Sequence, residues 1–91
     1  MKAENMTNSR GNVVPNQFII WGDNGEAIFQ SYDSVIVRIT YGPVDIVTEL
    51  DRDTWDYSVT TGKYRNQFLG ETKRETQAKI DSGEYILTNL N

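Results

Sequence analysis

The chain of 91 residues, 37% of them hydrophobic, has enough apolar material for one core and no room for a second. It contains no histidine and no cysteine, so it lacks the commonest general base, the thiolate nucleophile, disulfides and the usual zinc ligands. We therefore expect a single domain that is not an enzyme and that uses no cofactor and no metal.

The net charge of −4 is concentrated in the first part of the chain. Residues 1–56 carry four basic and nine acidic side chains, a balance of −5, whereas residues 57–91 carry five basic and four acidic, a balance of +1. An acidic protein repels phosphate backbones, which makes nucleic acid a disfavoured partner. No segment approaches the roughly 20 consecutive apolar residues of a membrane span, so we expect no membrane association.

Residues 1–12 are polar and include several asparagines and serines. A segment of this composition has too little apolar surface to pack against a core. The composition predicts a flexible tail over residues 1–12 and a folded domain over residues 13–91.

Asn24-Gly25 separates two apolar runs, Gln17–Asp23 and Glu26–Tyr32. Asn-Gly in this setting is the strongest local signal for a β-hairpin, because a type I′ turn needs positive φ at both central residues. A two-residue turn pairs Trp21 with Ile28 and Ile20 with Phe29. One face of the hairpin then carries Ile19, Trp21 and Ile28, and the other carries Phe18, Ile20 and Phe29.

Both faces of this hairpin are apolar, although a small sheet with one short helix can cover only one of them. The second face must be packed by the aromatic segment further along the chain, by the N-terminal tail or by a second copy of the protein. A two-fold dimer is the commonest symmetric solution, so the sequence favours a homodimer.

A second hairpin is predicted from Ser34–Tyr41 and Val44–Leu50, which flank Gly42-Pro43. A two-residue turn pairs Tyr41 with Val44, and every second residue beyond them then falls on one apolar face. The opposite face is mostly polar, and on it Arg38 can reach Asp45 or Glu49. This face-by-face alternation is typical of a half-buried antiparallel sheet. The apolar face contains Val35, Val37, Ile39, Tyr41, Val44, Ile46, Thr48 and Leu50.

Thr72-Lys-Arg-Glu75 has the pattern of a capping box and predicts a helix from Lys73 to about Ser82. Gly83 is a suitable left-handed stop, and Glu75 and Lys79 stand at i,i+4 spacing. Glu84–Leu90 then predicts a last strand. The sequence therefore indicates an α+β fold, a small antiparallel sheet of about five strands in two hairpins with one short C-terminal helix.

The stretch WDYSVTTGKYRNQFLG, residues 55–70, differs from the rest because it contains four aromatic residues. Trp55, Tyr57, Tyr64 and Phe68 could form a stacking platform for nucleic acid, edged by basic residues. The spacing also fits burial: Trp55 and Tyr57 alternate on an extended stretch, and Tyr64 and Phe68 share one face of a helical turn. We favour burial, with residues 60–62 as the bend between the two pairs, since so small a domain can hardly leave four aromatic side chains outside.

Four carboxylates, Glu49, Asp51, Asp53 and Asp56, precede and enter this stretch. They do not fit a calcium loop of the EF-hand type, since glycine is absent at the sixth position and glutamate at the twelfth. Gly62-Lys63 likewise lacks the earlier glycine and the following Ser or Thr of a phosphate loop. We therefore interpret the carboxylates as solvated groups rather than as a metal site.

The WDYSVTTGKYRNQFLG run, with PNQFIIW and FQSYDSVIV before it and ETKRETQAKIDSGEYILTNLN after it, resembles a family of small phage-encoded proteins of unknown function. The resemblance covers roughly residues 15–91. This sequence departs from the family pattern in the link from Gly42 to Asp53. An Asp/Gly-rich hairpin is expected there, and the sequence has Gly-Pro followed by an acidic tail. The resemblance implies a phage origin and a location in the cytoplasm of the host bacterium, but no activity.

A small acidic chain without a catalytic constellation favours a binding role, and acidic faces can occupy surfaces built for nucleic acid. We expect a protein that binds and modulates or inhibits a host protein, either a general host factor or a defence protein. Two alternatives remain: a nucleic-acid or nucleotide binder that uses Lys63, Tyr64, Arg65 and Arg74, and a component of the virion or of its assembly. The partner-binding face expected for the first hypothesis contains Glu49, Asp51, Asp53, Trp55, Asp56 and Tyr57.

Overall fold

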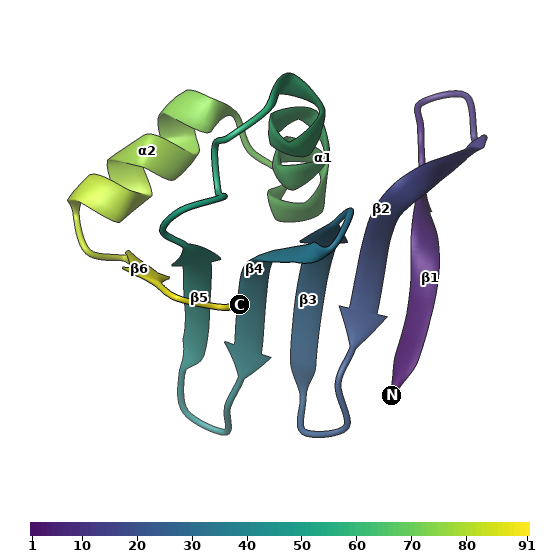
Figure 1. Ribbon diagram of the computed structural model, residues 1–91. Coiled ribbons are helices and arrows are strands. Elements are labelled where there is room, and N and C mark those ends of the chain that lie inside the picture. Colours follow the sequence, from purple (N-terminus) through teal and green to yellow (C-terminus); the bar gives the residue numbers. More distant parts are fainter.

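The computed structural model describes residues 1–91, which form a six-stranded sheet and two helices (Figure 1). The strands lie side by side in chain order, and all neighbours are antiparallel except the last two, which are parallel. The α+β class and both hairpins are confirmed, but the sheet is mixed and has one strand and one helix more than predicted. The strands are β1 (Lys2–Thr7), β2 (Val13–Trp21), β3 (Glu26–Ser31), β4 (Ser34–Tyr41), β5 (Ile46–Asp51) and β6 (Tyr85–Thr88), and the helices are α1 (Val59–Leu69) and α2 (Lys73–Asp81).

Strand β6 is parallel to β5 because of the connection between them. The chain leaves β5, passes through α1 and α2 and only then enters the sheet again (Figure 1). This long connection carries the chain back to the end of the sheet at which β5 begins, so β6 runs in the same direction as β5. Antiparallel neighbours need only a short hairpin turn. The prediction of a purely antiparallel sheet is wrong for this reason.

Strand β1 forms where the polar composition predicts a flexible tail. Residues Lys2–Asn5 pair with residues Phe18–Trp21 of β2, and the Asn5 side chain donates to the carbonyl of Val14 at 3.0 Å. Met6 lies at an irregularity of this pairing and is buried in the core. A strand needs only one apolar anchor when its backbone pairs along a neighbour, so the low hydrophobic content of this segment is a poor guide.

The first hairpin is confirmed, but its register differs by one residue from the prediction. Trp21 pairs with Ala27, and Ile20 pairs with Ile28. The turn has three residues instead of two: the Gly22 amide donates to the Glu26 carbonyl at 2.9 Å, and Gly25 takes a left-handed φ of 77°. A shift of one residue exchanges the two faces of β3. Phe29 therefore joins the core with Ile19, whereas Ile28 lies on the other face of the sheet with Phe18 and Ile20.

The second hairpin differs from the prediction by two residues, which leaves its faces unchanged. Tyr41 pairs with Ile46 and Val37 pairs with Leu50, because Gly42–Asp45 form a four-residue turn closed from the Gly42 amide to the Asp45 carbonyl at 2.8 Å. The predicted pair between Arg38 and Glu49 is present at 2.9 Å. An even shift preserves the alternation, so Val37, Ile39 and Leu50 reach the core as predicted. The prediction is wrong for Tyr41, Val44 and Ile46, which are exposed near the turn, and for Ile36, which is buried instead of lying on the polar face.

The core lies between one face of the sheet and the two helices. Phe29, Val37 and Leu50 are fully buried on adjacent strands, and Ile36 is turned into the same core by a bulge in β4. From the helices, Phe68 stacks on Phe29 with ring centroids 5.8 Å apart. The other helix residues that reach this core are Tyr64, Leu69 and Ile80.

Helix α1 replaces the irregular segment that the sequence predicts between the aromatic pairs. Ser58 caps it by accepting a hydrogen bond from the Thr61 amide, and Gly70 ends it with a left-handed φ of 70°. The predicted bend at residues 60–62 is therefore wrong, since these residues form the start of the helix. Tyr64 and Phe68 pack inward at i,i+4 spacing as predicted, and Trp55 is half-buried. Tyr57 remains 49% exposed.

Helix α2 begins at the predicted capping box. The Thr72 hydroxyl accepts from the Glu75 amide at 3.2 Å, and the Glu75 carboxylate accepts from the Thr72 amide at 3.0 Å. The predicted pair of Glu75 with Lys79 is not formed, because Lys79 contacts Glu71 at 2.7 Å instead. Neither helix has the length and apolarity that crossing a membrane requires.

Substitution of Thr72 by alanine tests this cap. Thr72→Ala removes the hydroxyl acceptor and leaves the Glu75 amide without its partner. We expect a loss of about 1 kcal/mol in the free energy of unfolding, the usual value for a lost N-cap. Urea denaturation followed by circular dichroism measures it, with Thr60→Ala as a matched control on an exposed position of α1. An unchanged unfolding midpoint in Thr72→Ala would show that the helix does not depend on this cap.

Candidate functional site

Asp51, one of the predicted partner-binding carboxylates, is buried at the end of β5 and is only 2% exposed. It accepts hydrogen bonds from the Thr54 hydroxyl at 2.7 Å, the Thr54 amide at 3.0 Å and the Leu90 amide at 2.8 Å. Burial raises the pKa of this carboxyl, but the hydrogen bonds from Leu90, Thr54 and their neighbours outweigh it and the pKa is lowered. Asp51 thus joins the turn after β5 to the C-terminal residues.

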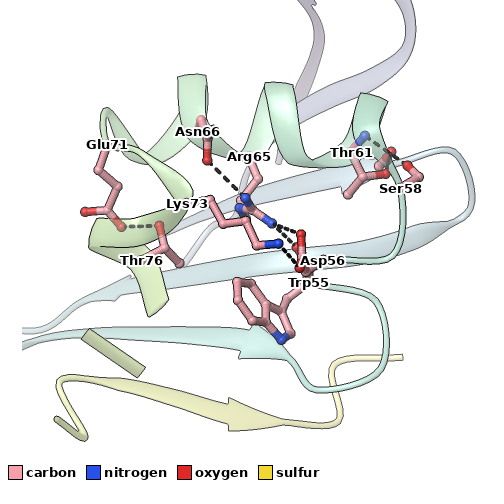
Figure 2. A network of polar contacts seen from close by, with 10 residues as sticks. Trp55, Asp56, Ser58, Thr61, Arg65, Asn66, Glu71, Lys73 and Thr76 are labelled. Atoms are coloured by element: carbon pink, nitrogen blue, oxygen red, sulfur yellow. Dashed lines mark hydrogen bonds and ion pairs between the residues drawn. The ribbon is translucent and has the colours of Figure 1, made fainter. Parts of the chain in front are cut away.

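Asp56, a second predicted carboxylate, lies in a polar network at the start of α1 (Figure 2). It contacts Lys73 at 2.7 Å and Arg65 at 3.3 Å. Burial raises its pKa, but the hydrogen bonds and positive charges of Lys73 and Arg65 have the larger effect, so the pKa is lowered overall. The carboxylate is therefore ionised at neutral pH. Its charge is therefore directed at two cations of the same chain.

Arg65 is the centre of this network and is only 1% exposed. Its guanidinium donates to the Trp55 carbonyl, to Asp56 and to the Asn66 side chain at 3.1 Å, and it lies over the Trp55 ring at 5.1 Å from the centroid (Figure 2). These contacts fasten the turn after β5 to helix α1. Arg65 is a structural anchor, which its position in the sequence gives no reason to expect.

The six residues of the predicted partner-binding face do not share one surface. Glu49 pairs with Arg38 on the face of the sheet opposite the helices, while Asp51 is buried and Asp56 points toward Lys73. Asp53 and Tyr57 are exposed, and Trp55 is half-buried under Arg65. The role of these residues in binding stays a prediction. Asp53, Asp56 and Tyr57 are exposed and Glu49 is half-buried, whereas Asp51 is out of a partner's reach.

The alternative basic strip is interrupted in the structure. Tyr64 and Arg65 are buried, whereas Lys63 on α1 and Arg74 on α2 are exposed. Lys63 lies over the Tyr64 ring at 5.5 Å and contributes to a cleft at the start of α1, and Arg74 lies outside that cleft. Lys73, the basic residue next to Arg74 in the sequence, lines the cleft in its place.

One face of the sheet packs against the helices, and the other face has no helix over it. Both helices contact the core face, which carries Phe29, Val37 and Leu50. The pairing register places Phe18, Ile20 and Ile28 on the opposite face, next to one another on β2 and β3. On the far strands the same face exposes Val47 and Ile86, 38% and 48% exposed. We call this surface, with Phe18, Ile20, Ile28, Val47 and Ile86, the open face.

Exposed aspartates surround the open face at the turns that link its strands. Asp23 lies in the turn between β2 and β3, Asp33 between β3 and β4, and Asp45 between β4 and β5, and Asp53 follows β5. Asp23 contacts the N-terminal amine. On the face itself Arg38 and Glu49 neutralise each other. The open face is therefore apolar and nearly neutral at its centre and acidic at its ends.

The described structure contains no group of three or more acidic side chains close enough to hold a metal ion. A family model described as a family of unknown function (DUF8033) matches residues 1–84. The chain belongs to this family. No curated protein and no solved structure matches the chain at a significant level. Its function must therefore be argued from its own surfaces.

This DUF8033 protein shows how one register error hides a surface. The two-residue turn that the sequence predicts would place Ile28 with Trp21, whereas the three-residue turn places Ile28 with Ile20. With the correct register, an apolar patch on the side without helices follows directly from the alternation of β2 and β3. The four turn aspartates, by contrast, are visible in the sequence as soon as the turns are known.

Proposed function

We propose that this member of DUF8033 is a non-enzymatic phage protein that binds a host protein through the open face and the acidic turns around it, and so modulates or inhibits that protein. The observation that carries the proposal is the open face itself, over which no helix packs and on which Phe18, Ile20 and Ile28 adjoin one another on β2 and β3. Exposed apolar patches rimmed by polar residues mark protein interaction sites.

The size of the open face favours a partner that also contacts the turns. Six strands spaced about 4.8 Å apart and roughly six residues long span about 500 Å². A stable interface buries about 800 Å² on each partner. The remaining contact must come from the rim, where Asp23, Asp33, Asp45 and Asp53 are exposed.

The charge of the rim defines the partner's chemistry. An apolar patch surrounded by basic residues complements it, as in host proteins that bind nucleic acid. A second copy of this chain would place one acidic rim against another, and like charges across an interface are unfavourable. The proposed occupant is therefore a basic host protein rather than a second copy, although the sequence alone favours a homodimer.

Substitution at the centre of the open face tests the proposal. Ile28→Lys places a charge between Ile20 and Arg38 on β2 and β4, and Lys can direct its amine to water without disrupting the sheet. We expect capture of one basic partner from a host lysate by the wild-type protein, and binding of that purified partner at least about 30-fold weaker to Ile28→Lys, about 2 kcal/mol. Calorimetry with the purified partner measures the affinities.

A matched control adds the same charge on the other side of the molecule. Ala78→Lys lies on an exposed position of α2 and should bind the partner like the wild type. Asp33→Lys and Asp53→Lys should slow association and weaken its dependence on salt. Equal affinity of Ile28→Lys and Ala78→Lys contradicts the proposal. Light scattering tests whether a second copy occupies the face instead. In that case the wild type has twice the chain mass of 10.4 kDa, and Ile28→Lys has the mass of a single chain.

A further inference from the structure

A cleft of about 640 Å³ opens at the start of α1, on the helix side of the molecule and away from the open face. Its walls come from the turn after β5, from the first two turns of α1 and from the start of α2. Three segments distant in the sequence therefore meet there. The residues that matter for the argument are Tyr57, Val59, Gly62, Lys63, Arg65 and Lys73.

The cleft is positively charged in a protein that is acidic. Lys63, Arg65 and Lys73 contribute three positive charges, and Asp56 contributes one negative charge, which leaves a balance of +2 against −4 for the whole chain. Asp56 uses only one of the three hydrogens on the Lys73 amine, and that side chain is 58% exposed. The two lysines thus retain donors for an anion.

The start of α1 adds backbone donors to these charges. Ser58 satisfies the Thr61 amide, but the amides of Val59 and Thr60 have no acceptor within the protein. The first turn of α1 contains no acidic residue that would compensate the positive end of the helix dipole. Free amides and a positive dipole at this point favour an anion.

Arg65 is a second and independent indication of a ligand. Its side chain is only 1% exposed, and it points from α1 toward Asp56 and Lys73 in the wall of the cleft (Figure 2). Its Nε has no hydrogen-bond acceptor within the protein. A buried donor without an acceptor is rare in native proteins, because desolvation without a hydrogen bond is unfavourable. An anion in the cleft adds negative charge beside this guanidinium, whose Nη1 and Nη2 already donate to Trp55, Asp56 and Asn66.

Neither the backbone conformation nor the packing of the fold requires glycine at position 62. The φ of Gly62 is not in the left-handed region, and a Cβ placed on it would lie 3.6 Å from Nη2 of Arg65, an ordinary van der Waals contact. Glycine within a helix is less stable than alanine, so it disfavours the fold here. What glycine provides at this position is a bare backbone that a ligand can approach closely.

The edge of the cleft suits a flat ring. Tyr57 is 49% exposed and Val59 is 91% exposed, and both line it. An aromatic side chain stacks on any nucleobase, independently of its sequence. A phosphate at the helix start and a ring at Tyr57 together describe a nucleotide.

We propose that the cleft between α1, α2 and the turn after β5 binds the phosphate group of a nucleotide, through the Val59 and Thr60 amides, Lys63 and Lys73, with the base against Tyr57. The site is separate from the open face, so it does not rest on the proposed host-protein binding. The net charge of −4 disfavours a long phosphate backbone, which favours a mononucleotide over a polynucleotide.

Amide chemical shifts of the intact protein test the site directly. We expect titration with adenosine 5′-monophosphate at constant ionic strength to shift the Val59, Thr60 and Gly62 amides to saturation, with a dissociation constant below about 1 mM. Inorganic phosphate should shift the same amides at least about tenfold more weakly, and adenosine should leave them unchanged. A 5′-phosphorylated oligonucleotide that binds more tightly than the mononucleotide would overturn the assignment to a mononucleotide.

Four substitutions separate binding from folding. Lys63→Gln and Lys73→Gln should each weaken the mononucleotide about tenfold, and Arg74→Gln, exposed on α2 outside the cleft, should leave the affinity unchanged. Gly62→Ala should raise the melting temperature by about 4 °C and yet weaken binding. The absence of saturable shifts up to 20-fold above the expected dissociation constant, or equal affinities of Lys63→Gln and Arg74→Gln, overturns the proposal.

Discussion

Replacement of Arg65 by alanine should lower the free energy of unfolding by about 4 kcal/mol. Removal of this fully buried side chain leaves a cavity, breaks the contact with Asp56 and leaves the Trp55 carbonyl without its donor. Loss of one partner from a buried ionic network costs about 3–5 kcal/mol, more than an ordinary surface pair contributes. Urea denaturation at neutral pH, followed by tryptophan fluorescence, measures the change.

A second substitution at the same position separates packing from hydrogen bonding. Arg65→Met keeps most of the volume over the Trp55 ring but provides no donor, so we expect a loss of about 2 kcal/mol. Arg74→Ala, an exposed arginine on α2, serves as the control and should change stability by less than about 0.5 kcal/mol. If Arg65→Ala loses less than about 1 kcal/mol, the network in Figure 2 does not hold the turn after β5 to α1.

The parts of the fold that the sequence predicts correctly depend on residues close together in the chain. The capping box Thr72–Glu75 is formed by side chains and amides three residues apart, and the stop at Gly83 is a local backbone requirement. The predicted register of β4 and β5 was wrong by two residues, but the predicted faces of Val37, Ile39 and Leu50 were correct, because an even shift does not exchange faces. Local signals of this kind give the existence and faces of an element.

The register of the first hairpin could not be predicted in the same way. Asp23-Asn24-Gly25 is compatible with a two-residue turn and also with a three-residue turn that ends in a left-handed glycine. The observed turn brings Phe29 to the face where Phe68 stacks on it, 39 residues further along the chain. The choice between the two turns therefore depends on packing that no window of the sequence contains.

Helix α1 was missed because its own residues favour a helix weakly. Its sequence VTTGKYRNQFL starts with three β-branched residues and a glycine, all poor helix formers. The helix is held by Thr61, Tyr64 and Arg65, which are buried against the sheet and the turn after β5. Stability that comes from tertiary contacts leaves little trace in propensity.

The candidate sites show the same division between local and distant information. Charge patterns identified Lys63 and Asp53 as accessible, since exposed charges need no partner elsewhere in the chain. The burial of Asp51 depends on the Leu90 amide, and the neutralisation of Asp56 depends on Lys73. A carboxylate near an aromatic residue therefore looks the same in sequence whether it binds a partner or holds the fold together.

Substitution of Asp51 by asparagine should cost about 3 kcal/mol at neutral pH, and the cost should shrink in acid. The asparagine amide presents hydrogens where the Thr54 and Leu90 amides require acceptors, so at least one buried donor loses its partner. Because hydrogen bonds lower the pKa of Asp51 below its unfolded value of about 3.9, its stabilisation is fully present above that pH. It is lost as the pH falls through the folded pKa, where the wild-type carboxyl is itself protonated.

Urea denaturation of the wild type and Asp51→Asn at pH 7, 4 and 2.5 measures this convergence. We expect the difference between the two proteins to be largest at pH 7 and to fall by at least about half at pH 2.5. Asp53→Asn is the matched control, since Asp53 is exposed and its side chain accepts no hydrogen bond, and it should behave like the wild type at every pH. A difference for Asp51→Asn that stays constant across this range would mean that the charge of Asp51 does not stabilise the fold. The junction of β5 with the C-terminal residues would then depend on the shape of the side chain alone.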